Sequence, residues 1–167
     1  MLFETDRLYV TKWKRGDLDS LYQLFNDTAI KEFIFPQLTI EETKHIFEKQ
    51  LKDYESNFPF GRYFIVEKVS SDFIGLLLLK KIKDKNGVEI GYSLIKKQWK
   101  KGYATEIVSQ GVHWLFEHTK FSNIYAVTDT DNTDSKNVLI KSGFFQQKNI
   151  SELGKEMNLF SLQKFKY

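Results

Sequence analysis

The segment that joins an expected strand to an expected helix carries the residues best suited to binding an anion. Four lysines within Lys96–Lys101 precede Gly102, and the small residue Ala104 follows it. The first turn of a helix presents unpaired backbone N–H groups and the positive end of the helix dipole. Together these features predict a phosphate or pyrophosphate site. The same residues also fit a basic, glycine-capped helix start that binds nothing.

Other motifs that carry chemistry are absent or incomplete. The sequence has no glycine-rich dinucleotide pattern, no phosphate loop of the G-x-x-x-x-G-K type and no G-x-S-x-G. The run Asp129–Asp134 begins like a calcium loop, but Asp134 replaces the required glycine and Ile140 the final glutamate. His113 and His118 are five residues apart, on different faces of a helix. We therefore expect no metal site.

Helix and strand patterns alternate along the chain and frame the anion-binding segment. Alternating or β-branched runs predict strands over 8–13, 63–69, 74–82, 88–95, 124–128, 144–147 and 159–165. Apolar periodicity predicts helices capped by Asp17, by a Thr39–Glu42 capping box and near Asn132, with the longest stripe over Ala104–Phe116. This order predicts an α/β (α+β) fold with a mixed, mostly antiparallel sheet.

Composition bounds the class of protein. The chain has 167 residues, 41% of them hydrophobic and none of them cysteine, which predicts a single domain over 1–167 without disulfides. The longest apolar run, Phe73–Leu79, is too short to span a bilayer, and Met1–Arg7 lacks the features of a secretory signal. We therefore expect a cytoplasmic protein with no membrane partner. Because only three arginines occur, we expect no nucleic-acid partner.

Several motifs resemble, in order and at the right spacing, those of the GNAT acyltransferase superfamily. Trp99–Ala104 resembles its acetyl-CoA motif, [Q/R]-x-x-G-x-[G/A]. The branch that includes the ribosomal-protein N-terminal acetyltransferases (the Rim-type branch) is resembled at Glu4–Leu8, Glu89–Tyr92, Gly102–Glu106, Asn132-x-x-Ser135 and Lys141–Phe144. The resemblance covers essentially the whole chain. It implies a sheet with helices on both faces and direct transfer of an acetyl group from acetyl-CoA to an amine.

Two residues depart from the family pattern. Trp99 stands where the motif has glutamine or arginine, and Lys100 stands where the branch usually has glycine. If the turn requires a positive φ at Lys100, the lysine costs about 1 kcal/mol. Its ammonium group is also suited to partner the phosphates of the ligand.

The resemblance implies roles for residues on the cofactor side. Backbone amides of Lys101, Gly102, Tyr103, Ala104 and Thr105 are expected to hold the pyrophosphate of acetyl-CoA. Leu94 and Ile95 are expected to pair with the pantetheine arm, and the Leu94 N–H to polarise the thioester carbonyl. Asn132 is expected to hold the arm and Ser135 to donate toward the sulfur. Asn132 is also a suitable helix cap, and Lys141 either reaches the ribose phosphate or is solvated.

Glu89 is the candidate general base for the acceptor amine, which must lose a proton before it attacks. Strand alternation places Glu89, Gly91 and Ser93 on the face opposite Val88 and Ile90, so Glu89 has a glycine beside it that leaves room for a substrate. A solvated strand glutamate without a chemical role is the alternative.

The acceptor is the least determined feature. The resemblance implies that 26–38 and 149–156 rim the cleft, with 58–61 beside them. A protein N-terminus is the leading acceptor, a small-molecule amine (an antibiotic, a polyamine or an amino acid) is the alternative, and a CoA-binding module without turnover is a third. Either a monomer or a homodimer fits the sequence.

Overall fold

The computed structural model describes residues 1–31, 38–82, 86–152 and 154–164. The strands are β1 (Phe3–Glu4), β2 (Leu8–Thr11), β3 (Gly61–Glu67), β4 (Phe73–Ile82), β5 (Gly87–Leu94), β6 (Asn123–Asp129), β7 (Phe145–Gln146), β8 (Ile150–Glu152) and β9 (Lys155–Gln163). The helices are α1 (Leu18–Asn26), α2 (Thr28–Lys31), α3 (Ile40–Ser56), α4 (Tyr103–His118) and α5 (Thr133–Lys141), with 3-10 turns at Arg15–Asp17 and Lys96–Gln98.

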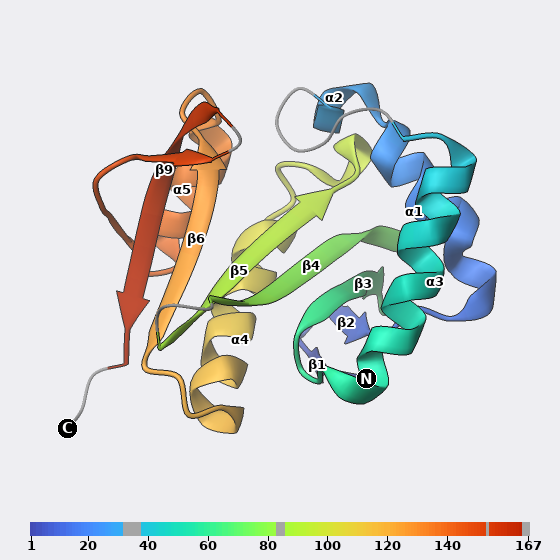
Figure 1. The fold of residues 1–167 in the computed structure, drawn as a ribbon, viewed down its shortest axis with the longest axis horizontal. Coiled ribbons are helices and arrows are strands. Elements are labelled where there is room, and N and C mark those ends of the chain that lie inside the picture. Colours follow the sequence, from blue (N-terminus) through green and yellow to red (C-terminus); the bar gives the residue numbers. More distant parts are fainter. Residues whose placement is uncertain (32–37, 83–85, 153, 165–167) are drawn as a thin grey trace.

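The strands form one sheet in the order β1-β2-β3-β4-β5-β6-β9-β7, and β8 pairs with β9 (Figure 1). Every pairing is antiparallel except that of β5 with β6, which is parallel. A parallel pair needs a crossover connection, and α4 provides it. The prediction of a mixed, mostly antiparallel sheet is confirmed.

Helices cover both faces of the sheet. On one face α4 packs so closely that a Cβ on Gly111 would lie 2.8 Å from Ile90 Cδ1 of β5. On the other face, Phe47 of α3 stacks on Trp13, which in turn contacts Phe64 of β3. In Figure 1, α4 lies behind β4 and β5, whereas α1 and α3 lie at the β2–β3 end.

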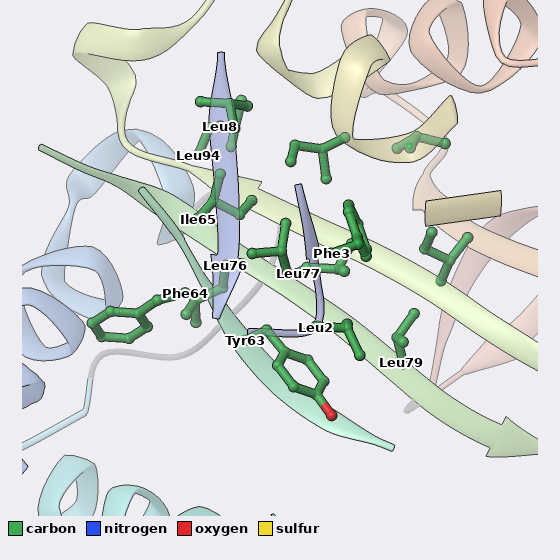
Figure 2. Close-up of a cluster of buried hydrophobic side chains, with 14 of the residues drawn as sticks. Leu2, Phe3, Leu8, Tyr63, Phe64, Ile65, Leu76, Leu77, Leu79 and Leu94 are labelled. Atoms are coloured by element: carbon green, nitrogen blue, oxygen red, sulfur yellow. The ribbon is translucent and has the colours of Figure 1, made fainter. Parts of the chain in front are cut away.

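Long aliphatic and aromatic side chains from the first strands of the sheet fill the core. Leu8, Ile65 and Leu77 are fully buried, and Figure 2 shows them grouped where β2 crosses the central strands. Tyr63 and Phe64 leave β3 in different directions because successive side chains of a strand alternate between faces (Figure 2). Each face therefore receives its own apolar layer, and the central strands are held rigid between them.

Most expected elements form, with informative exceptions at short ones. Both bonds of the Thr39–Glu42 capping box are present, from Glu42 N to Thr39 Oγ1 (3.2 Å) and from Thr39 N to Glu42 Oε2 (2.7 Å). Asp17 precedes α1 as expected, but its carboxylate accepts from Lys14 N rather than from the helix. The short elements β1, α2 and β8 were not predicted. Strand 8–13 ends at Thr11, and the end of strand 159–165 lies outside the described residues.

Candidate active site

The central feature of the site is the separation of β5 from β6. The two strands pair only at their starts, where Gly87, Val88 and Glu89 of β5 face Asn123, Ile124 and Tyr125 of β6. Beyond this point β5 continues to Leu94 and β6 to Asp129 without pairing with each other, and the two ribbons diverge in Figure 1. Backbone groups at the far half of β5 are thus left on an opened edge of the sheet.

The register of β4 and β5 decides which backbone groups these are. Ile95 N donates to Ile74 O (3.0 Å), so residues 95 and 74 form a hydrogen-bonded pair. Because such pairs alternate along an antiparallel ladder, the backbone groups of Leu94, paired with Gly75, point away from β4 toward the opening. The Leu94 carbonyl already accepts from Trp99 Nε1 (2.7 Å). Of the two residues predicted to pair with a pantetheine arm, Leu94 therefore offers its N–H, whereas the Ile95 N–H is used by β4.

The turn before α4 has an unusual backbone. Gly102 has φ 82° and forms the N-cap of α4, and Lys100 has φ 60°. Lys100 thus occupies the left-handed region that favours glycine, which is the condition under which a lysine at this position costs free energy. The first intrahelical bond runs from Glu106 N to Gly102 O (3.1 Å), so the N–H groups of Tyr103, Ala104 and Thr105 have no acceptor within the helix.

Arg7 fixes this turn from the opposite end of the sequence. Its Nη1 donates to Lys101 O (3.0 Å), its Nε to Glu106 Oε2 (2.7 Å), and its guanidinium lies 4.4 Å from the centroid of the Tyr103 ring. Thr5 Oγ1 also donates to Glu106 (2.5 Å). Burial raises the pKa of Glu106, but the hydrogen bonds from Thr5 and Arg7 outweigh it and hold that pKa below its ordinary value. The helix start is therefore held in place before any ligand arrives.

The α4 start and the opened strands line one cleft of about 1390 Å³. Of the predicted site residues, those that line it are Glu89, Leu94, Trp99, Lys100, Gly102, Tyr103, Ala104, Thr105, Asn132 and Ser135. Ile95 and Lys101 do not line it; Lys101 Nζ donates to Gln98 Oε1 (2.8 Å). Of the expected rim, Ala29, Ile30, Phe60, Gly61, Glu152 and Lys155 line the cleft, and 32–37 lie outside the described residues.

Glu89 lies directly across the sheet from Lys80 of β4. Lys80 Nζ is 3.1 Å from Glu89 Oε2 and 4.0 Å from Glu152 Oε1, so one ammonium group bridges two carboxylates from β5 and β8. The Glu89 side chain is 17% exposed, which leaves it accessible from the cleft without being fully solvated. This position is compatible with proton transfer to or from a molecule in the cleft.

Two hydroxyl groups meet on the opposite wall. Tyr92 Oη of β5 donates to Ser135 Oγ of α5 at 3.4 Å, a long bond that joins the two elements where the sheet has opened. Burial raises the pKa of Tyr92, partly offset by the bond to Ser135, so the phenol stays protonated at neutral pH. Asn132 caps α5 by accepting from Ser135 N (3.0 Å) through Oδ1. The capping interpretation of Asn132 is thus observed, and the residue also lines the cleft.

The comparison with known proteins explains this arrangement. The family profile of the acetyltransferase (GNAT) domain matches residues 7–145 of the chain. The chain belongs to the GNAT family of N-acetyltransferases. The match spans both the α4 start and the α5 start, and of the described residues that line the cleft only Glu152, Lys155 and Met157 lie beyond it.

Individual relatives agree with the family and leave the acceptor open. An uncharacterized N-acetyltransferase of Bacillus subtilis, YoaA, is 28% identical over 86% of this chain and 82% of its own. The ribosomal-protein-S5-alanine acetyltransferase of Vibrio fischeri superposes with a TM-score of 0.81 (18% identity; 96% and 95% of the two chains). The spermidine N-acetyltransferase of Vibrio cholerae, solved with CoA and spermine, gives 0.79 (17%; 93% and 95%). These two structures share the GNAT fold and carry names with different acceptors.

Two residues of this GNAT site lie within the family motifs Glu4–Leu8 and Glu89–Tyr92 but were given no role from the sequence. Arg7 meets Lys101 across 94 positions of chain, and Tyr92 meets Ser135 across 43. Tyr92 also falls among the apolar positions of its strand, so alternation alone assigns it to the core. The position of α5 next to β5 in the folded chain brings the Tyr92 hydroxyl to Ser135 at the cleft.

Two further observations concern membrane-spanning helices and metal sites in the described part of the chain. None of its helices is long and apolar enough to cross a membrane. Within the same residues, no group of three or more His, Asp or Glu side chains is arranged to hold a metal ion.

Proposed function

We propose that this chain transfers the acetyl group of acetyl-CoA to a primary amine by direct attack within a ternary complex. The observation that carries the proposal is that the unpaired amides at the start of α4 and the opened edge of β5 line the same cleft. The first feature suits a pyrophosphate and the second an extended arm with amide groups. No other described segment combines the two.

The residues at the α4 start fit the pyrophosphate of acetyl-CoA. Gly102 has no Cβ, and the nearest atom that a Cβ at this position would meet, apart from its chain neighbours, is Arg7 Nη2 at 3.4 Å. Phosphate oxygens can therefore approach the N–H groups of Tyr103, Ala104 and Thr105 without a side chain in the way. Lys100 is exposed at the same turn and adds a positive charge. The energetic cost of its left-handed backbone is consistent with a position kept for function.

The residues of the opened edge fit the reacting end. Acetyl-CoA, when bound, supplies the activated acetyl group. The N–H of Leu94 donates to the thioester carbonyl oxygen, and Glu89 accepts a proton from the amine through a water as the amine nitrogen attacks the thioester carbon. The carbon–sulfur bond then breaks, and Ser135 donates a hydrogen bond to the departing sulfur, which takes up a proton from water. Tyr92 positions Ser135 by donating to its oxygen, which leaves the serine hydrogen directed elsewhere.

A protein N-terminus is the leading acceptor. Its support is the open cleft, which runs from Ala29 and Phe60 to Met157 and has room for a short peptide. A small-molecule amine is the alternative.

Calorimetry followed by an acceptor screen tests the proposal. We expect heat on titration with CoA and with acetyl-CoA, and release of the CoA thiol when peptides with free N-termini are added. Blocked peptides, which lack the amine, should release no thiol above background. Binding without turnover on any amine would instead support a CoA-binding module, and the absence of heat would remove the proposal.

A further inference from the structure

Arg62 is a charged residue of the cleft that the proposed acetyl transfer does not use. It lies on β3, is only partly exposed and lines the cleft together with Gln50 and Gly61. Its backbone is fixed on both sides, because its N–H donates to Gln50 Oε1 (2.9 Å) and its carbonyl accepts from Tyr54 Oη. The guanidinium, in contrast, forms no hydrogen bond or ion pair with any residue of the described ranges.

The lack of an acidic partner separates Arg62 from the other cations of the cleft. Lys80 is paired with Glu89 and Glu152, and Lys155 with Asp129. Lys81, Lys100 and Lys141 are exposed, so water solvates them. Burial lowers the pKa of the Arg62 guanidinium, opposed by the neighbouring Tyr54 hydroxyl. A guanidinium remains charged despite such a shift, and a partly buried charge without a counter-ion is costly.

A second unpaired donor lies in the same wall. Gln50 is 6% exposed, and its Nε2 has no hydrogen-bond partner among the residues described. A Cβ on Gly61 would lie 2.4 Å from this nitrogen, so glycine is what allows the amide to reach this position. The wall formed by Gln50, Gly61 and Arg62 therefore holds an unpaired amide donor and a positive charge, and the Gln50 carbonyl oxygen is already used by the Arg62 N–H.

The sheet register relates this wall to the reacting end of the cleft. Arg62 faces Leu78 of β4, and Leu78 faces Gly91 of β5, so the three residues form one row on the face that carries Glu89. Two strand spacings put the Cα atoms of Arg62 and Gly91 roughly 10 Å apart. Gly91 has no side chain and leaves open space above the sheet in this row, since a Cβ there would meet only Leu78, at 3.7 Å. A short molecule lying over Gly91 can reach Glu89 with one end and Arg62 with the other.

We propose that the acceptor of this enzyme carries a carboxylate close to its reactive amine, and that Arg62 binds that carboxylate. The proposal rests on the proposed acetyltransferase function and names its class of substrate. Guanidinium and carboxylate groups pair in a bidentate geometry that also fixes orientation. An acidic side chain at the first or second residue of a peptide and the α-carboxylate of a free amino acid both supply this group.

Paired acceptors that differ only in the carboxylate test the proposal. One arm uses C-terminally amidated peptides that begin with Asp or Asn, and the second uses free amino acids with their carboxamides. The parent should acetylate the carboxylate member of at least one pair with a kcat/KM roughly tenfold to a hundredfold higher, the range of a charge-assisted hydrogen bond. The arm that shows the preference identifies the source of the carboxylate.

Variants of Arg62 assign the preference to this side chain. Arg62→Gln should reduce the preference to about twofold or less by lowering kcat/KM for the carboxylate acceptor alone, and Arg62→Lys should restore part of it. Arg15→Gln is the matched control, because Arg15 is exposed in a 3-10 turn away from the cleft. It should keep the parental preference. Thermal unfolding and CoA affinity of each variant separate loss of fold from loss of recognition.

Three results would overturn the proposal. The first is that the parent acetylates carboxylate and carboxamide acceptors equally well in both arms. The second is that Arg62→Gln lowers kcat/KM for both members of a pair by the same factor. In either case acetyl transfer itself still occurs, so the proposed function stands and only the role of Arg62 falls. Absence of turnover on every acceptor would instead remove the proposed function, and this inference with it.

Discussion

The substitution Gly102→Val examines the anion site where the backbone conformation is most demanding. At φ 82° a side chain strains the backbone by about 1–2 kcal/mol. For a chain of this size that cost lowers Tm by roughly 2–8 °C. The nearest atom to the added Cβ, at 3.4 Å, is the flexible end of Arg7, so we expect the fold to persist.

The effect on the ligand should be much larger than the effect on stability. The valine methyl groups would cover the N–H groups of Tyr103, Ala104 and Thr105, and each charge-assisted hydrogen bond lost costs about 1.5–3 kcal/mol. Loss of two such bonds predicts that the Kd for CoA, measured by isothermal titration calorimetry, rises by at least about 100-fold.

Gly154→Val provides the matched control. Gly154 has φ 78° and no atom within 4 Å of an added Cβ, so its backbone strain is similar, whereas it lies outside the α4 start. This variant should lose a comparable amount of Tm and keep the parental Kd for CoA. If the two variants bind CoA within threefold of each other, the assignment of the pyrophosphate to residues 102–105 is refuted.

Three other predictions concern the reaction and the contacts of Glu106 that hold the turn before α4. Glu89→Gln should lower kcat by about 100-fold or more, most strongly at low pH where the amine is protonated; a pH–rate profile parallel to that of the parent would argue against a base. Ser135→Ala should reduce kcat more than it raises the Kd for CoA, and equal losses would make Ser135 a binding residue instead. Glu106→Gln should lower Tm by about 2–4 °C at pH 7, because Arg7 is half exposed and the ion pair is partly screened. The depressed pKa of Glu106 means that its stabilisation is present at neutral pH and is lost as pH falls below about 4.5, so the two Tm curves should converge in acid; a constant difference would contradict this.

The fold was largely predictable because its signals are local. The strands β3, β4 and β5 each carry enough β-forming residues to be recognised alone, and the capping box of α3 uses two residues three positions apart. The missed elements β1, α2 and β8 have only two to four residues each, too few for a periodic pattern. They form because neighbouring strands and α1 support them.

The site divides in the same way. The α4 start was predictable because Gly102 and the residues around it are contiguous. Comparison with the family motif identified Lys100 as a departure whose cost depended on φ, and the structure supplies the positive φ. Arg7, Tyr92 and Arg62 were not found as functional candidates. Each acquires its position from sheet register or from contacts with distant segments, which a single sequence does not encode locally.

A crystal structure of the protein with bound CoA tests the central claim most directly. We predict that pyrophosphate oxygens lie within hydrogen-bond distance of backbone N–H groups at residues 102–105, and that the pantetheine arm runs between β5 and β6 past the Leu94 N–H. Density for CoA elsewhere on the molecule, with the gap between these two strands filled by solvent, would contradict the account.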